Sequence, residues 1–185
     1  MSDDDLLHRS QRGDRKAFDA LTEKYRDRVL CAVAAMVGDD AQAEDLVQEA
    51  LRKAWEALPK FERRCKVSTW LYQIALNLAR NHIRDRAHRA APESPSRLDA
   101  RPAERRTVLS SVIRHERAEL IALAIDRLPP TLREAFVLHY IEDLPYEEIA
   151  EIVGANVGTL QVRAVRAKKL LRKQLGPLVD TVWRE

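Results

Sequence analysis

The chain has 185 residues, enough for one domain or two small ones, and 45% of them are hydrophobic. Its net charge of +3 and its pI near 9.0 are mildly basic, so the placement of the charges is more informative than their sum. No apolar run reaches membrane-spanning length, and the acidic start at 1–5 is the opposite of a signal peptide. We therefore expect a cytoplasmic protein without membrane insertion.

Helical periodicity runs through most of the chain, and no stretch alternates β-branched residues, so we expect an all-α fold. The first two helices are predicted over 4–13 and from residue 15 to about 37. Phe18, Leu21 and Tyr25 recur there at three- and four-residue steps. This part has no acid–base pair, no metal-ligand cluster and no glycine-rich phosphate loop, so its helices are predicted to form core. No cofactor and no metal site are expected.

A third helix, predicted over 41–58, divides into two faces. Its apolar face is formed by Ala43, Leu46, Val47, Ala50, Leu51, Ala54 and Leu58. Its outward face is formed by Glu44, Asp45, Gln48, Glu49, Arg52 and Lys53. A surface helix of any protein has this pattern, so alone it is weak support for a function.

The segment 60–84 is basic and interleaved with aromatic residues. Its cations are Lys60, Arg63, Arg64, Lys66, Arg80 and Arg84, and Phe61, Trp70 and Tyr72 lie among polar groups such as Gln73 and Asn77. Ser68 or Thr69 is expected to cap a helix that runs to about residue 87. Aromatic rings that stack on bases, with cations along the backbone, suit single-stranded nucleic acid. The alternative is that Phe61 and Trp70 are core residues, and for Trp70 this alternative is favoured.

Two cysteines do not make a disulfide framework or a zinc site. Cys31 lies in an apolar helix and is predicted to be a small core residue. Cys65 has cationic neighbours, which would lower the pKa of its thiol if it were exposed. A redox role for Cys65 is the less favoured interpretation.

The segment 86–106 breaks the periodicity with Pro92, Pro95 and Pro102 among charged and small residues. This composition cannot bury enough apolar surface to fold alone, so it predicts a flexible linker between two small helical domains whose relative placement is free until a partner fixes it. We expect domains at 1–88 and 119–185, with linker and helix lead-in over 89–118. After the break at Pro129-Pro130, a helix over 132–140 is expected to pack under the segment that follows.

The stretch 144–173 has the pattern of a helix-turn-helix. Apolar residues recur at helical spacing behind Pro145, Gly154 breaks the pattern, and Asn156 can cap a second helix. That second helix places Leu160, Ala164, Ala167 and Leu171 on one face, which is predicted to be core.

The two helices of this motif carry opposite charges. The first has Glu147, Glu148 and Glu151, whereas no acid occurs between Val157 and Lys173. Thr159, Val162, Arg163 and Arg166 project away from the apolar face near the start of the second helix, the part that enters the major groove in helix-turn-helix proteins. Cations near a helix C-terminus also favour the helix dipole, so a solvated face is the simpler alternative.

Several separated motifs together resemble the extracytoplasmic-function sigma factors of bacteria. They are Asp45-Leu46-Val47-Gln48-Glu49, Phe61, Ser68-Thr69-Trp70-Leu71-Tyr72-Gln73-Ile74-Ala75-Leu76-Asn77, Leu128-Pro129, Tyr146-Glu147-Glu148-Ile149-Ala150 and Val157-Gly158-Thr159. The resemblance covers both domains in order. It implies a non-catalytic subunit that binds RNA polymerase core, directs promoter-specific initiation in a stress or environmental response, and is controlled by an anti-sigma factor.

The resemblance also implies residue roles. The β′ clamp helices would contact the outward face of the third helix, that is Glu44, Asp45, Gln48, Glu49, Arg52 and Lys53. The opened −10 strand, with one base flipped into a pocket, would contact Phe61, Arg63, Arg64, Lys66, Thr69, Trp70, Tyr72, Gln73, Asn77, Arg80 and Arg84. The −35 duplex would contact Asn156, Gly158, Thr159, Gln161, Val162, Arg163, Arg166 and Lys169, and the second domain would touch the β flap.

The sequence departs from the family pattern at two places. Leu160, Gln161 and Val162 stand where a valine, a basic residue and a small polar one are usual, which leaves the promoter sequence open but not DNA binding. Cys65 stands where a small or polar residue is common. Two other classes remain: a helix-turn-helix repressor or activator, which leaves the first domain unexplained, and a helical adaptor that binds only proteins.

Overall fold

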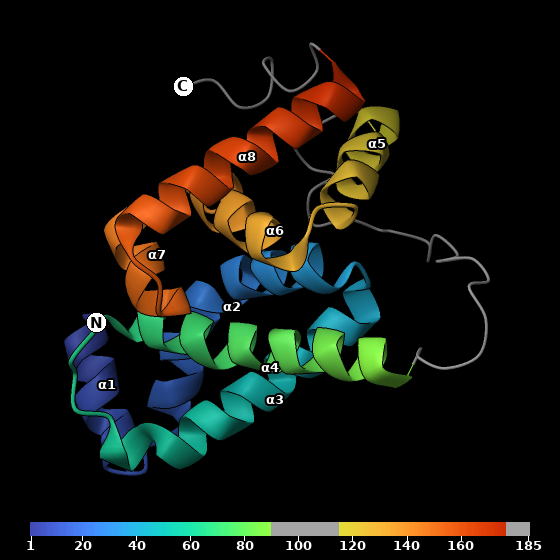
Figure 1. Ribbon diagram of the computed structural model, residues 1–185. Helices are drawn as coiled ribbons and strands as arrows, with labels where there is room; N and C mark the ends of the chain where they lie inside the picture. The colour runs from blue at the N-terminus through green and yellow to red at the C-terminus, as the bar shows by residue number, and fades with distance from the viewer. Residues whose placement is uncertain (90–114, 177–185) are drawn as a thin grey trace.

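The computed structural model describes residues 1–89 and 115–176, and every regular element in these two ranges is helical (Figure 1). The all-α prediction is confirmed. Most of the linker predicted over 89–118, and residues 177–185, lie outside the described residues. The N-terminal part contains α1 (Asp3–Gln11), α2 (Arg15–Val37), α3 (Asp40–Ala57), the short η1 (Leu58–Lys60) and α4 (Val67–Arg89).

The helix ends follow local chemistry. Asp14 and Asp39 cap α2 and α3 by accepting hydrogen bonds from backbone N–H groups, so α3 begins one residue before the predicted start. Gly38 ends α2 in the left-handed conformation, with φ of 74°. The helix α4 begins at Val67, ahead of the predicted caps, and Thr69 lies inside its first turn with its side chain fully buried.

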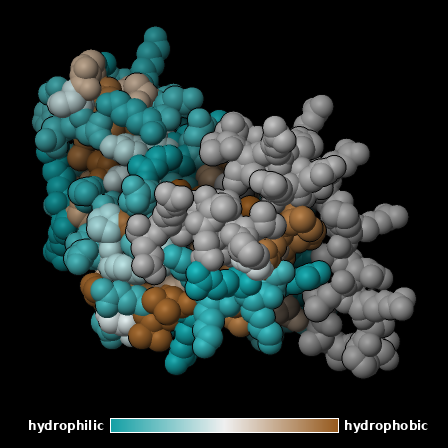
Figure 2. All heavy atoms as spheres, turned by 90° about the horizontal axis from the view of Figure 1, so that it is seen from above, coloured by the Kyte–Doolittle hydropathy of each residue, from teal (hydrophilic) through white to brown (hydrophobic). Residues whose placement is uncertain are grey.

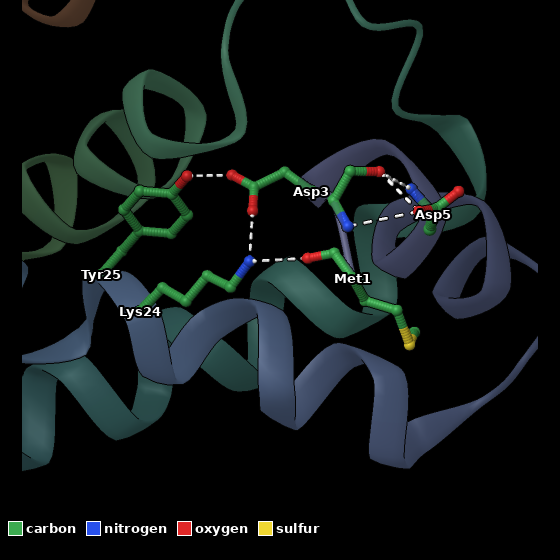
Figure 3. A network of polar contacts seen from close by, with 6 residues as sticks. Met1, Asp3, Asp5, Lys24 and Tyr25 are labelled. Atoms are coloured by element: carbon green, nitrogen blue, oxygen red, sulfur yellow. Dashed lines mark hydrogen bonds and ion pairs between the residues drawn. The ribbon is translucent and has the colours of Figure 1, made fainter.

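The long helix α2 lies at the centre of the N-terminal domain, against α1, α3 and α4. The fully buried side chains of this domain include Phe18, Leu21, Leu58 and Leu76. A polar network ties α1 to α2 (Figure 3): the Asp3 carboxylate accepts a hydrogen bond from the Tyr25 hydroxyl and forms an ion pair with the Lys24 ammonium at 2.7 Å. The chain start is therefore fixed against the body of the domain.

The C-terminal part contains α5 (His115–Asp126), α6 (Pro130–Phe136), the π-helical turn η3 (Val137–Ile141), α7 (Tyr146–Val153) and α8 (Val157–Leu175). The single helix expected over 132–140 is thus α6 continued by a π turn, where the N–H of Glu142 donates to the carbonyl of Val137 at 3.0 Å. Phe136, Ile149, Leu160 and Leu171 are fully buried, and α8 lies across α6.

The two domains are in contact, with α2 and α4 facing α5, η3 and α7 (Figure 1). The Arg133 guanidinium donates to the carbonyl of Met36 at 2.6 Å, across the domain boundary. This corrects the expectation that the relative placement is free. The composition of the linker indicates only that this segment does not fold alone. Whether the two domains bind each other depends on their surfaces, which the linker sequence does not describe.

Candidate nucleic-acid interface

The helix-turn-helix is formed by α7 and α8, joined at Gly154 in the left-handed conformation with φ of 69°. Asn156 caps α8, and its side-chain oxygen accepts a hydrogen bond from the backbone N–H of Thr159 at 2.7 Å. The four apolar residues predicted to face the core are all buried: Leu160, Ala164, Ala167 and Leu171. The prediction of this motif is confirmed, and its packing fixes which face of α8 points outward.

The outward face of α8 is basic and accessible. Gln161, Arg166 and Lys169 are exposed, and Val162 and Val165 are 50% and 60% exposed. Figure 2, seen from above the view of Figure 1, shows mostly hydrophilic atoms with separate hydrophobic areas in the part that is not drawn in grey. Cationic side chains beside small apolar groups can contact phosphates, base edges and thymine methyl groups.

Three of the residues predicted to contact the −35 duplex are not exposed, unengaged side chains. Asn156 acts as the helix cap, so its side-chain oxygen is already engaged. Arg163 is half-buried and lies near Glu134: burial raises the pKa of that carboxyl, and Arg80 and, to a smaller extent, Arg163 act against this rise. Gly158 has open space around it, since an added Cβ would meet only Asn156 Oδ1 at 3.7 Å.

A second candidate surface lies at the loop before α4. The rings of Phe61 and Trp70 stack with centroids 4.5 Å apart and planes 26° apart, and both side chains are half-buried. The amide of Gln11 donates to the carbonyl of Phe61 at 2.9 Å, which holds the loop against α1. Phe61 and Trp70 are thus neither core residues nor free rings but a partly exposed aromatic pair.

A cleft of about 400 Å³ opens beside this pair, between the start of α1 and the loop. It is lined by Ser2, Asp3, Asp4, Leu7, Tyr25, Phe61, Arg63, Cys65, Lys66, Val67 and Ser68. Arg63 has a positive φ of 57° and lies 3.5 Å from the Asp4 carboxylate, while Arg64 pairs with Glu62 at 2.5 Å. Cations, carboxylates and an aromatic wall therefore share one opening.

Several predicted strand-binding residues of α4 are covered by the C-terminal domain. Thr69 and Tyr72 are buried at 0% and 1% exposure, and their hydroxyls donate to Glu148 and Glu142. The amide of Gln73 donates to the carbonyl of Glu151 at 2.9 Å, and Arg80 forms an ion pair with Glu134. Asn77 and Arg84 remain exposed. The structure brings these residues to one face of α4 but places half of that face against another domain.

The outward face of α3 matches its predicted composition. Glu44, Asp45, Gln48, Arg52 and Lys53 are exposed, and Glu49 is half-buried. Arg52 lies between Glu49, at 2.6 Å, and Glu56, and its hydrogen bonds hold the pKa of Glu49 at about 2. The charged side chains of this face are therefore in contact with solvent, and several of them form ion pairs with one another. Asp45 is exposed and accessible to a partner.

Neither cysteine has the environment of a reactive thiol. Burial, together with Glu142, raises the pKa of Cys31 to about 12. Burial and then Glu151 raise the pKa of Cys65, although cationic residues flank it in the sequence. The prediction of a lowered Cys65 pKa was conditional on exposure, and the thiol is half-buried.

We accordingly expect both thiols to alkylate slowly at neutral pH, because the thiolate is the reactive form and a raised pKa lowers its fraction. The Cys65 rate should rise only at a pH above that at which free cysteine becomes reactive. Iodoacetamide labelling of the native Cys31→Ser variant, followed by mass spectrometry, measures this rate, and the unfolded variant is the control. Labelling of native Cys65 as fast as free cysteine would contradict the raised pKa of this half-buried thiol.

Neither a metal site nor a membrane-spanning helix is found among the described residues. No group of three or more His, Cys, Asp or Glu side chains there is placed to hold a metal ion. No helix within 1–89 or 115–176 combines the length and the apolar character needed to cross a bilayer.

Sequence comparison matches two parts of the chain to known families. Residues 21–89 match sigma-70 region 2, and residues 118–171 match sigma-70 region 4. The RNA polymerase sigma-H factor of Pseudomonas aeruginosa is 38% identical over 184 residues, which cover 96% of this chain and 95% of the relative. The ECF RNA polymerase sigma-E factor of Escherichia coli is 32% identical over 186 residues, covering 97% of each chain.

Solved structures have the same fold. The sigma factor RpoE of Bartonella quintana, crystallised with the anti-sigma factor NepR, matches with a TM-score of 0.67 and 25% identity, covering 86% of this chain and 97% of RpoE. CnrH, solved with the cytosolic domain of CnrY, matches with a TM-score of 0.69 and 23% identity, covering 92% and 94% of the two chains. The likeness to CnrH concerns the fold alone.

Proposed function

Because this chain belongs to the extracytoplasmic-function sigma factors of the sigma-70 family, we propose that it divides promoter recognition between two surfaces, the outward face of α8 and the loop and start of α4. It is an alternative sigma factor, a transcription initiation subunit. We assign it no catalytic activity of its own and place its action in the cytoplasm with the polymerase. The observation that carries the proposal is the outward face of α8, accessible and cationic, fixed by a buried apolar stripe on the other side.

In vitro transcription with purified bacterial core polymerase tests this function. A library of promoter fragments is transcribed with and without the protein, and the start sites are sequenced. We expect initiation that depends on the protein and shares one pair of −35 and −10 sequences. Tight duplex binding by the protein alone, without initiation, would instead support a helix-turn-helix repressor or activator.

The proposed −35 contacts predict the effect of removing Arg166. If the guanidinium contacts a base, Arg166→Ala should weaken binding to the −35 duplex by about 1–3 kcal/mol. If it contacts a phosphate instead, the slope of log K against log salt concentration should fall in magnitude by about one. Arg163→Ala should act in the same direction. Fluorescence anisotropy with polymerase holoenzyme at several salt concentrations measures both. Lys16→Ala, which removes one cation from the exposed side of α2, should leave binding unchanged.

The outward face of α3 is proposed to contact the β′ clamp helices. Asp45→Arg should weaken core polymerase binding at least tenfold, roughly 1.4 kcal/mol or more, because it reverses a charge at the centre of an exposed polar face. Glu23→Arg makes the same charge change on an exposed part of α2 and is the control. Equal retention of both variants on immobilised core polymerase would remove α3 from the interface.

The loop and the start of α4 are proposed to hold the opened −10 strand. The stacked pair of Phe61 and Trp70 offers an aromatic surface for unpaired bases, and the cleft beside it, with Arg63 and Lys66 on its wall, could take one extruded base. Binding energy from the extruded base would offset the stacking lost on opening, so no hydrolysis is needed.

We infer that an anti-sigma factor controls this chain. Support comes from the RpoE structure, whose partner is an anti-sigma factor. An open groove of about 650 Å³ in the C-terminal domain offers a place for such a partner, since it is lined by Leu132 and Leu170 with the cations Arg166, Lys169, Arg172 and Lys173. Affinity purification from the native host, under resting and stress conditions, should recover a non-polymerase protein under one of them. Recovery of polymerase subunits alone under both would count against this partner.

A further inference from the structure

The open groove of about 650 Å³ in the C-terminal domain lies between α6 and the C-terminal half of α8. Two of its lining residues are leucines: Leu132 of α6 is half-buried, and Leu170 of α8 is 38% exposed. The others are cations of α8, namely Arg166, Lys169, Arg172 and Lys173. The methylene stems of such side chains cover apolar surface while their charged ends stay in water, so the groove combines an apolar lining with a cationic rim.

The end of α8 directs the chain toward this groove. Gly176 follows the last helical residue with φ of 60°, a conformation that favours glycine and lets the chain turn away from the helix axis. Residues 177–185, which we call the tail, come directly after it. Arg166 lies about 15 Å back along α8 from Gly176, whereas an extended chain from Gly176 to Trp183 spans up to about 23 Å. The whole groove is therefore within reach of the tail.

The composition of the tail is complementary to the groove. Its apolar residues are Leu178, Val179, Val182 and Trp183. It also supplies two carboxylates, Asp180 and Glu185, against one cation, Arg184. The helix α8 contains no Asp or Glu, so carboxylates for the cationic rim have to come from another segment. Burying an indole in an apolar groove is favourable, and opposite charges at its rim fix the orientation of the bound segment.

We propose that the tail turns back along α8 and binds in this groove, with its apolar side chains against Leu132 and Leu170 and its carboxylates beside the cations of the rim. A segment tethered next to its site has an effective concentration of about 1 mM. An intrinsic Kd of about 0.1 mM therefore leaves about ten closed molecules for each open one. The tail of the same molecule is thus favoured over that of a second copy at micromolar protein concentrations.

The bound tail competes with any partner that uses the same groove. An anti-sigma factor that binds there must displace the tail, so its apparent affinity is lowered by the fraction of molecules in which the groove is open. This consequence alone rests on the proposed function. Binding of the tail is independent of it and is tested without DNA, polymerase or a partner.

The fluorescence of Trp183 in the full-length chain tests this arrangement. Trp55→Phe and Trp70→Phe together leave Trp183 as the only indole. Acrylamide quenching of its emission is compared with that of a synthetic peptide of residues 176–185. We expect quenching several-fold weaker than in the peptide and an emission maximum at shorter wavelength. Both should be unchanged on dilution, because the contact is intramolecular.

A charge placed in the groove should release the tail. Leu170→Asp in the same background is expected to raise the quenching of Trp183 to the level of the peptide. Leu120→Asp is the matched control, because it makes the same change at a leucine of α5 that is 52% exposed and does not line the groove. Circular dichroism checks that both variants are folded.

Two results of the quenching experiment would overturn the proposal. One is quenching at the level of the peptide before any change in the groove, and the other is equal quenching in Leu170→Asp and Leu120→Asp. Protection that disappears on dilution would assign the groove to the tail of a second copy, and the intramolecular arrangement would be wrong.

Peptide binding in trans gives a second measure that needs no substitution in the groove. A fluorescein-labelled peptide of residues 176–185 is titrated with the full-length wild type and with full-length Trp183→Asp, and anisotropy gives the two Kd values. We expect Trp183→Asp to bind the peptide about tenfold more tightly, because its own tail no longer competes. Equal affinity of the two proteins, or no binding to either, would mean that the groove does not hold the tail.

Discussion

Replacing Trp70 by alanine is expected to lower promoter opening by one to two orders of magnitude. The indole stacks on Phe61 at the edge of the cleft, and loss of one base-stacking ring costs about 1–3 kcal/mol. The barrier to opening should rise by a similar amount, because the stack forms only with unpaired bases. Permanganate footprinting of the −10 region in the holoenzyme measures the opened fraction directly.

Two controls separate this effect from misfolding. Trp70→Phe keeps an aromatic ring and should retain most of the opening. A promoter with a pre-opened mismatch bubble should restore much of the transcription by Trp70→Ala, since the strand no longer has to be separated. If the bubble gives no recovery, or if Trp70→Phe is as defective as Trp70→Ala, the ring has a structural role only.

Replacing Phe136 by alanine is expected to destabilise the C-terminal domain by about 3–5 kcal/mol. Phe136 is fully buried where α6 meets α8, and its ring lies 5.1 Å from that of Tyr140. Alanine would leave a cavity beneath the recognition helix, because the surrounding helices can close only part of the space. A loss of this size is a large share of the 5–15 kcal/mol typical of a whole domain, so −35 binding should fall with it.

Urea unfolding followed by circular dichroism measures the change. Leu123→Ala is the comparison, since it also truncates an apolar side chain but one that is 40% exposed on α5. Its free energy of unfolding should change by less than about 1 kcal/mol. Equal losses in the free energy of unfolding of the two variants would mean that the packing of Phe136 between α6 and α8 does not stabilise the domain.

The prediction of α8 succeeded because its signals are local. An apolar residue every three or four positions decides which face is buried, and a polar side chain before the first turn decides where the helix begins. Leu160 and Leu171 are buried, and Asn156 is the cap. The charged outward face follows from the same pattern, because the residues that do not pack must face solvent.

The contact between Phe61 and Trp70 could not be predicted from local sequence patterns. Periodicity placed Trp70 on α4 and favoured the core for it, whereas the structure leaves the indole half-buried beside Phe61. Its partner Phe61 lies outside the helix, and the loop is held by Gln11, some fifty residues earlier in the chain. The cleft beside the pair likewise needs α1, which the sequence predicted only as a core helix.

What the sequence by itself determined is the set of helices and their buried faces, because each depends on spacing within one segment, and the family, because its motifs follow one another in order along the chain. What only the tertiary structure decided is which polar groups are already occupied. Nothing near Glu134, Glu142 or Arg28 in the sequence marks them as partners of α4 or of one another. Such pairs depend on the distance between atoms of two domains, and no periodicity in either segment records it.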